Sequence, residues 1–292
     1  MVSFLPVSPP APAAAPVQVL FSALVDDAGL FPPEELDMAS AVVRHRGDSA
    51  QDSPVLSHRF VVPAARLPEL QSQLTAADRF AVSIITAAES AAVDRVTDLV
   101  AADDRLELVG VETPLPADWV TDSASIEQAL RRLPAGVPVF VEVPTGNDTE
   151  RALDLLAEQR WSAKIRCGGI RPELFPTTTR LAATIGLCVA WDVPFKATAG
   201  LHHAVRYLDP ATGFTHHGFL NILVAVARAV RGAGELAVIA ALESVDAAAL
   251  VAEAVDLDTP TAARVRALFV SYGSCSTSDP ITDLTALKLI AS

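Results

Sequence analysis

Short apolar runs of strand-like composition alternate along this chain with longer segments of helical character, and this alternation is the strongest constraint on its fold. β-branched and aromatic residues mark seven expected strands, at 17–24, 58–62, 80–85, 106–111, 137–143, 162–167 and 194–198. Helix-like segments between them begin near Ser90, Ser125 and Asp148, residues suited to capping the first free amides. The alternation is typical of a parallel sheet built from repeated βα units.

An eighth strand is harder to place, because residues 199–266 are too many for one ordinary crossover. We favour ALFVSYGS at 267–274 and keep LAVIAALE at 236–243 as the alternative. The Asp-Thr-Pro start at 258–260 also allows the favoured segment to be the end of a helix. Eight βα units favour a closed barrel over an open doubly wound sheet, so we predict an α/β fold, a (β/α)8 TIM-type barrel with an insertion between strands seven and eight.

The domain organisation expected is one barrel over 17–292, with 199–266 as a helical insertion near the barrel mouth that includes a helix from His216 to Arg231. The proline-rich start, 1–16, has no basic region or apolar core of a signal peptide, and we expect a disordered tail. No apolar run approaches the roughly 20 residues that span a bilayer. These features predict a cytoplasmic protein.

The charge balance limits the partners. Acidic residues number 35 and basic residues 22, giving a formal net charge of -13 that repels phosphate backbones and anionic lipid surfaces. We therefore expect a small-molecule substrate, no nucleic acid and no membrane partner, with a homo-oligomer compatible with the sequence. Three cysteines without CxxC spacing indicate neither a disulfide framework nor a structural zinc site.

The lysines are the most informative residues for chemistry. Only Lys164, Lys196 and Lys288 occur among the 22 basic residues. A lysine can lose its proton and act as an amine nucleophile, whereas arginine stays charged. Lys164 and Lys196 lie within apolar strands, where a lone ammonium is costly unless it is used or paired. Their positions therefore suggest a function for the amines.

Side-chain alternation places Lys164 and Arg166 on one face of the sixth strand, and Lys196 and Thr198 on one face of the seventh. If both faces point into the barrel, the two amines lie close together. A cationic neighbour and a desolvated pocket both lower the pKa of a lysine, and a neutral amine adds to a carbonyl to form an imine. We predict Lys164 as this nucleophile and Lys196 as the neighbour that lowers its pKa.

Other polar residues stand where expected strands end, and this end of a barrel carries the active site. Among them are Asp26, Asp27, Thr86, Glu112, Glu142 and the 274–276 loop. For Asp26, Asp27 and Glu142, a salt bridge or a helix cap explains the residue equally well. Glu112 or a histidine is expected to move protons.

Four of the six histidines form two adjacent pairs, His202 with His203 and His216 with His217. Neighbouring residues point in different directions, so each pair offers one inward ring rather than a chelating couple. We expect catalytic or ligand-orienting histidines, with capping, loop packing or metal ligation as alternatives. Asn221 joins the site if the helix that contains it points its N-terminus at the mouth, an end that also favours an anion.

Four segments resemble the class I aldolases of the deoxyribose-phosphate aldolase type. They are AKIRCGG with Lys164, FKATAGL with Lys196, SYGSCS at 271–276 and FVEVPTG around Glu142. The resemblance implies a TIM barrel in which the sixth-strand lysine forms a Schiff base and the second lysine tunes it. It also implies that the glycine-rich turn of the eighth strand holds a substrate phosphate.

The chain departs from this family at several positions. Cys275 stands where the family has a serine, Arg166 replaces a small polar residue, and Glu112 is the acid nearest to the family's fourth-strand aspartate. The long segment after strand seven is foreign to the family. The sequence therefore supports the barrel and the paired lysines better than the deoxyribose phosphate substrate.

We predict from these features a lysine-dependent, Schiff-base aldolase or lyase for a small carbonyl substrate, with or without a phosphate group, that needs no cofactor or metal. The catalytic candidates are Lys164, Lys196, Glu112, Glu142, His202, His203 and His216, and the substrate-binding candidates are Arg166, Gly200, His217, Asn221, Gly273, Ser274 and Ser276. One alternative is a Mg²⁺-assisted, enolase-like lyase or isomerase that uses Glu112 and Glu142. Another is a noncatalytic barrel that binds an anionic metabolite.

Overall fold

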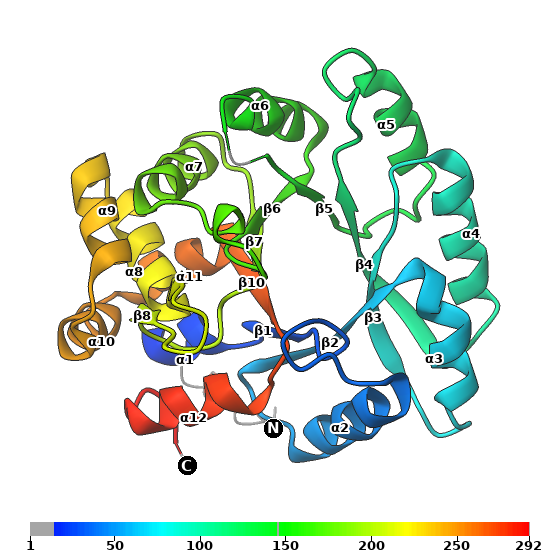
Figure 1. Ribbon diagram of the computed structural model, residues 1–292, viewed down its shortest axis with the longest axis horizontal. Coiled ribbons are helices and arrows are strands. Elements are labelled where there is room, and N and C mark those ends of the chain that lie inside the picture. Colours follow the sequence, from blue (N-terminus) through cyan, green and yellow to red (C-terminus); the bar gives the residue numbers. More distant parts are fainter. Residues whose placement is uncertain (1–14, 145, 292) are drawn as a thin grey trace, which may run out of the picture.

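A computed structural model describes residues 15–144 and 146–291, and eight parallel strands in this part of the chain close into a barrel (Figure 1). The order around the barrel is β1-β10-β7-β6-β5-β4-β3-β2. The barrel strands are β1 (Val25–Asp27), β2 (Leu56–Pro63), β3 (Phe80–Ile85), β4 (Leu106–Pro114), β5 (Val139–Glu142), β6 (Ser162–Arg166), β7 (Phe195–Thr198) and β10 (Phe269–Ser274). The predicted (β/α)8 barrel with an insertion before its last strand is confirmed.

Helices surround the ring of strands (Figure 1). On the first six crossovers they are α2 (Met38–Gln51), α3 (Leu67–Gln73), α4 (Ser90–Ala101), α5 (Ser123–Leu130), α6 (Thr149–Gln159) and α7 (Thr178–Ala190), with short 3-10 turns at Ala64–Arg66 and Pro172–Leu174; α12 (Ser278–Ala286) follows the last strand. Side chains of Asp37 and Thr177 cap α2 and α7 by accepting from Ser40 N and Arg180 N. No helix in the described ranges is long and apolar enough to cross a membrane.

The prediction of a first strand at 17–24 is wrong. Pro16–Phe21 forms helix α1, with proline in its first turn, and β1 follows at Val25–Asp27. Leu20 and Phe21 are buried, and α1 packs against α11. Tertiary packing of an apolar helix face thus overrides the strand preference of its valines. The tail expected at 1–16 lies almost wholly outside the described residues.

The insertion contains one hairpin and several helices. The hairpin pairs β8 (Tyr207–Leu208) with β9 (Thr215–His216). The helices are α8 (Phe219–Val230), α9 (Glu235–Glu243), α10 (Ala247–Val255) and α11 (Thr259–Leu268). The segment kept as an alternative strand, 236–243, lies in α9, so the choice of 267–274 for the last strand is supported, with β10 beginning at Phe269. The helix expected from His216 begins at Phe219, because His216 belongs to the hairpin.

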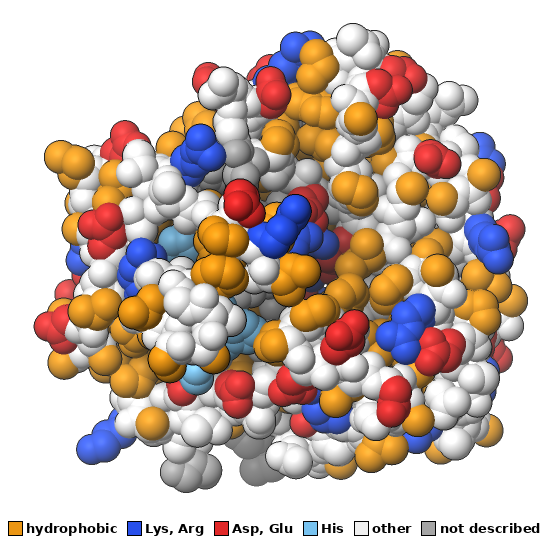
Figure 2. All heavy atoms as spheres, in the orientation of Figure 1, with side chains coloured by type: hydrophobic (Ala, Val, Ile, Leu, Met, Phe, Trp, Pro, Cys, Tyr) orange, Lys and Arg blue, Asp and Glu red, His pale blue; other side chains and the backbone are white. Residues whose placement is uncertain are grey.

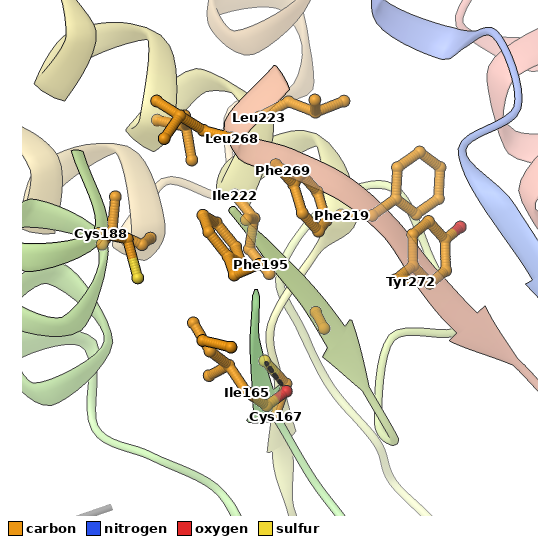
Figure 3. Close-up of a cluster of buried hydrophobic side chains, with 14 of the residues drawn as sticks. Ile165, Cys167, Cys188, Phe195, Phe219, Ile222, Leu223, Leu268, Phe269 and Tyr272 are labelled. Atoms are coloured by element: carbon orange, nitrogen blue, oxygen red, sulfur yellow. Dashed lines mark hydrogen bonds between the residues drawn. The ribbon is translucent and has the colours of Figure 1, made fainter. Parts of the chain in front are cut away.

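A buried apolar cluster behind β6, β7 and β10 fixes the strands that carry both lysines (Figure 3). The rings of Phe195 and Phe269 stack at 5.2 Å between centroids. The rings of Phe219, at the start of α8, and Tyr272, on β10, also stack at 5.2 Å. Burying each such side chain contributes about 1.5–3 kcal/mol. Ile165 packs into this cluster, so its strand neighbours face the opposite side, the barrel interior.

Candidate active site

The strand register places the two lysines side by side. Lys164 on β6 is the pairing partner of Lys196 on β7, and Arg166 is the partner of Thr198. Both lysine side chains are buried, with 6% and 1% of their surface exposed. The β-sheet pairing therefore brings both amines to one place inside the barrel.

Glu112 on β4 connects the two amines. Its Oε2 lies 3.0 Å from Lys164 Nζ, and its Oε1 lies 2.5 Å from Lys196 Nζ. The hydroxyl of Ser83 donates to the same Oε1 at 2.9 Å. The Glu112 carboxylate thus lies between the two ammonium groups and shields Lys164 from the positive charge of Lys196.

Asp26 on β1 completes the partners of Lys196. Lys196 Nζ donates to Asp26 Oδ2 at 2.8 Å, and Ser271 on β10 donates to the same oxygen at 2.8 Å. Ser57 on β2 donates to Asp26 Oδ1 at 2.6 Å. Sequence reasoning considered Asp26 as a strand-end acid but left it out of the site. Its signal was a carboxylate within an apolar segment, which needs a buried partner.

Glu142 and Arg166 form the outer part of the network. Arg166 Nε donates to Glu142 Oε1 at 2.8 Å, while Glu142 Oε2 lies 3.4 Å from Lys164 Nζ. The side chains of Glu142 and Arg166 are 23% and 36% exposed. Lys164 therefore stands between a deeply buried acid and a half-buried acid.

The buried groups hold one another in their charged forms. Burial alone would raise the pKa of Glu112, but Lys196 and Lys164 outweigh it and hold that pKa well below its usual range. For Asp26, Lys196 and Arg59 likewise outweigh burial and lower the pKa. Burial would lower the pKa of Lys196, and the Asp26 and Glu112 carboxylates raise it instead.

These pKa shifts predict the pH range over which the network stabilises the fold. The lowered pKa values of Asp26 and Glu112 contribute stability above their ordinary values of 3.8 and 4.5, and this contribution is lost as the pH falls towards the folded-state values. The raised pKa of Lys196 contributes below 10.5 and its contribution is lost at higher pH. We expect wild type to have a higher free energy of unfolding in urea than Glu112→Gln, and this difference should shrink below about pH 4. A difference independent of pH in acid would contradict an ionised Glu112.

An inner cavity of about 260 Å³ opens above the lysines and is lined by both of them, Glu112, Arg166 and Thr198. Figure 2 looks onto this end of the barrel, where charged side chains lie in a hollow bordered by hydrophobic ones. Gly200 also lines the cavity, with φ of +72°, and an added Cβ there would lie 2.8 Å from Gly168 Cα. The glycine is therefore required by close backbone approach at the ends of β6 and β7.

His202 is the only one of the paired histidines that lines the inner cavity. Its Nδ1 lies 3.5 Å from Cys275 Sγ. Burial lowers the pKa of His202, and the neighbouring His216 lowers it further. The ring is therefore neutral near pH 7 and able to accept a proton.

His216 lies one layer farther out. It lines an outer hollow of about 690 Å³ that shares Gly200, His202 and Cys275 with the inner cavity. Its Nδ1 donates to the Gly200 carbonyl at 3.0 Å, and its ring stacks on Tyr207 at 5.0 Å between centroids. The hairpin thus reaches the mouth, whereas no residue of 218–266 lines either space.

Three other residues of the expected site make polar contacts within the chain. His217 Nε2 donates to the Pro176 carbonyl at 2.8 Å, and burial lowers the pKa of His217 to about 4. Asn221 donates to the carbonyls of Ala241 and Ser244 and accepts from Arg206 N. His203 is half exposed and pairs with Asp283 at 3.2 Å. None of the three lines the inner cavity, and His203 lines the outer hollow instead.

The turn after β10 also differs from the expectation. Gly273 and Cys275 line the inner cavity, but Ser274 and Ser276 do not. Ser274 Oγ donates to the Ser276 carbonyl at 2.6 Å, and Ser276 Oγ accepts from Asp279 N at 3.2 Å at the start of α12. Both hydroxyls therefore stabilise the turn itself.

Within 15–144 and 146–291, no group of three or more His, Cys, Asp or Glu side chains is arranged to hold a metal ion. Glu112 and Glu142, the acids of the magnesium alternative, each contact cationic side chains.

The chain matches no protein-family model and shows no significant similarity to any curated protein.

Proposed function

We propose that this chain is a lysine-dependent aldolase or lyase in which Lys164 forms a Schiff base with a small carbonyl substrate. The observation that carries the proposal is the pair of register-matched lysines joined by Glu112 at the base of a cavity. Lys164 is the better candidate nucleophile, because its closest acid lies at 3.0 Å and Lys196 is held at 2.5 and 2.8 Å.

Imine formation follows from these contacts. The Lys164 ammonium passes a proton to Glu112, and its nitrogen lone pair adds to the substrate carbonyl carbon to give a carbinolamine. Glu112 returns a proton to the departing hydroxyl, water leaves, and an iminium remains. The net change is R₂C=O plus Lys–NH₃⁺ giving R₂C=NH⁺–Lys plus water. Lys196 is a positioning residue here, since it holds Glu112 in place and ionised.

The iminium then acts as an electron sink for carbon–carbon cleavage. A base removes the proton of the substrate's β-hydroxyl, the Cα–Cβ electron pair moves into the iminium to give an enamine, and an aldehyde leaves. His202 is the neutral base nearest to this role, since it lines the same cavity. Protonation of the enamine and hydrolysis of the imine restore Lys164.

Borohydride trapping tests the proposal. We expect incubation with small aldehydes and borohydride to leave a reduced adduct that peptide mass mapping places on Lys164. If a substrate that turns over leaves no adduct on either cavity lysine, the Schiff-base mechanism is refuted. Activity lost on EDTA treatment and restored by Mg²⁺ would instead support the enolase-like alternative, whereas binding without turnover that survives Lys164→Arg would support anion binding.

The histidines provide a matched pair of variants. We expect His202→Ala to lower kcat/KM by roughly 10²–10⁴-fold, because a proton-transferring side chain is lost from the cavity. His217→Ala should instead lower the free energy of unfolding by about 1–3 kcal/mol, because it leaves a buried carbonyl unpaired, with little change in kcat/KM. Steady-state kinetics and urea unfolding of both variants measure the two effects. The reverse pattern would place the proton transfer at His217.

A further inference from the structure

Resting on the proposed function, we infer that the substrate of this site is an uncharged carbonyl compound with an apolar substituent, rather than a phosphorylated one. The first argument is charge. Each cation lining the inner cavity, Lys164, Lys196 and Arg166, has a carboxylate oxygen within 3.0 Å. Arg59 also approaches Asp26, at 3.5 Å, but it does not line the cavity. The lining therefore offers a phosphate no unpaired positive charge.

The outer hollow, which borders the inner cavity, is negatively charged, whereas a phosphate needs positive charge. The outer hollow is lined by Glu34, Asp209 and Asp279, and no lysine or arginine is among its described lining residues. Arg44, from outside the hollow, pairs with Glu34 at 2.6 Å and leaves the two aspartates. Asp279 also occupies the first turn of α12, where a negative side chain disfavours a bound anion.

The turn that would hold a phosphate has its hydroxyls engaged. Ser274 Oγ donates to the Ser276 carbonyl, and Ser276 Oγ accepts from the Asp279 amide in the first turn of α12. Cys275, which stands between them and faces the cavity, carries a thiol whose pKa is raised by burial. A buried neutral thiol is a weak donor and suits an uncharged ligand better than a phosphate.

The remaining wall of the cavity is apolar. Its lining includes the apolar side chains of Phe31, Val61, Ile85, Ile170 and Leu174. Ile170 is 77% exposed and borders both the inner cavity and the outer hollow. A small cavity with this wall gains affinity by burying methylene groups of the substrate.

A homologous series of aldehydes measures this gain. We expect the rate of borohydride-trapped adduct formation at Lys164, normalised to free lysine, to rise about fourfold per added methylene from propanal to pentanal. Glycolaldehyde phosphate should react more slowly than glycolaldehyde. Faster trapping of the phosphate ester at Lys164 would overturn this inference and leave the Schiff base intact, whereas no Lys164 adduct with any aldehyde would overturn both.

Variants of the wall provide the control. Leu174→Asn should remove most of the gain per methylene, and Leu236→Asn, at an 83% exposed position on α9, should leave it unchanged. Ile170→Lys adds an unpaired cation at the rim and should raise trapping of glycolaldehyde phosphate by at least about fivefold. An unchanged methylene series in Leu174→Asn would contradict the apolar subsite.

Discussion

Replacing Lys164 with methionine is expected to abolish both borohydride trapping and turnover, a loss on the order of 10³-fold or more, because the amine proposed to form the imine is removed. The fold should survive. Glu112 keeps Lys196 at 2.5 Å and Glu142 keeps Arg166 at 2.8 Å, so neither acid is left without a cation. Kinetics, trapping and urea unfolding of the purified variant measure these effects.

Two further lysine variants sharpen this result. Lys288→Met, at an exposed position near the C-terminus, controls for labelling of surface amines and should change neither measurement. Lys164→Arg keeps the charge beside Glu112 and Glu142 but cannot form an imine, so it should be inactive with a stability close to wild type. Full turnover in a folded Lys164→Met protein would refute the assignment of the nucleophile.

Replacing Glu112 with glutamine is expected to damage both stability and catalysis. Removing one partner of a buried ion pair costs about 3–5 kcal/mol, and the lower end applies because Lys196 retains Asp26 and Lys164 retains Glu142. Turnover should fall by roughly 10²–10⁴-fold, because the group that moves protons between the amine and the carbinolamine is lost. Urea unfolding and steady-state kinetics measure the two losses.

Trapping should respond to this change differently from turnover. Borohydride should still trap Lys164 in Glu112→Gln, because the amine remains in the cavity and keeps Glu142 beside it. Ser83→Ala is the matched control, since it removes only the hydroxyl that donates to Glu112 at 2.9 Å and should cost about 1 kcal/mol. Loss of trapping at every pH in the folded glutamine variant would show that Glu112 positions Lys164 rather than moving protons.

Much of the fold followed from local pattern. Strand-like runs at 58–62, 80–85 and 106–111 lie within β2, β3 and β4, because β-branched composition and two-residue alternation are properties of a few consecutive residues. The prediction of a strand at 17–24 was wrong for the same reason. Its composition favours a strand, but packing of α1 against α11, nearly the whole chain away, decides its conformation.

The sequence by itself determined the barrel and the choice of lysines. Their rarity and their apolar strands distinguished Lys164 and Lys196, and the two-residue period placed Lys164 on one face with Arg166 and Lys196 on one face with Thr198. Only the tertiary structure decided what surrounds them. The partners of Lys196 lie 84 and 170 residues away in the chain, at Glu112 and Asp26.

Long-range closure of the barrel likewise decided which polar residues are free to meet a substrate. His217, Asn221 and Ser274 have the residue types of a binding site, but packing partners within the chain use their polar atoms. His202 has no such sequence signal beyond its pairing with His203, and yet it lines the cavity. A side chain's type is set by the sequence, whereas its availability depends on hydrogen-bond partners that only the folded chain brings within reach.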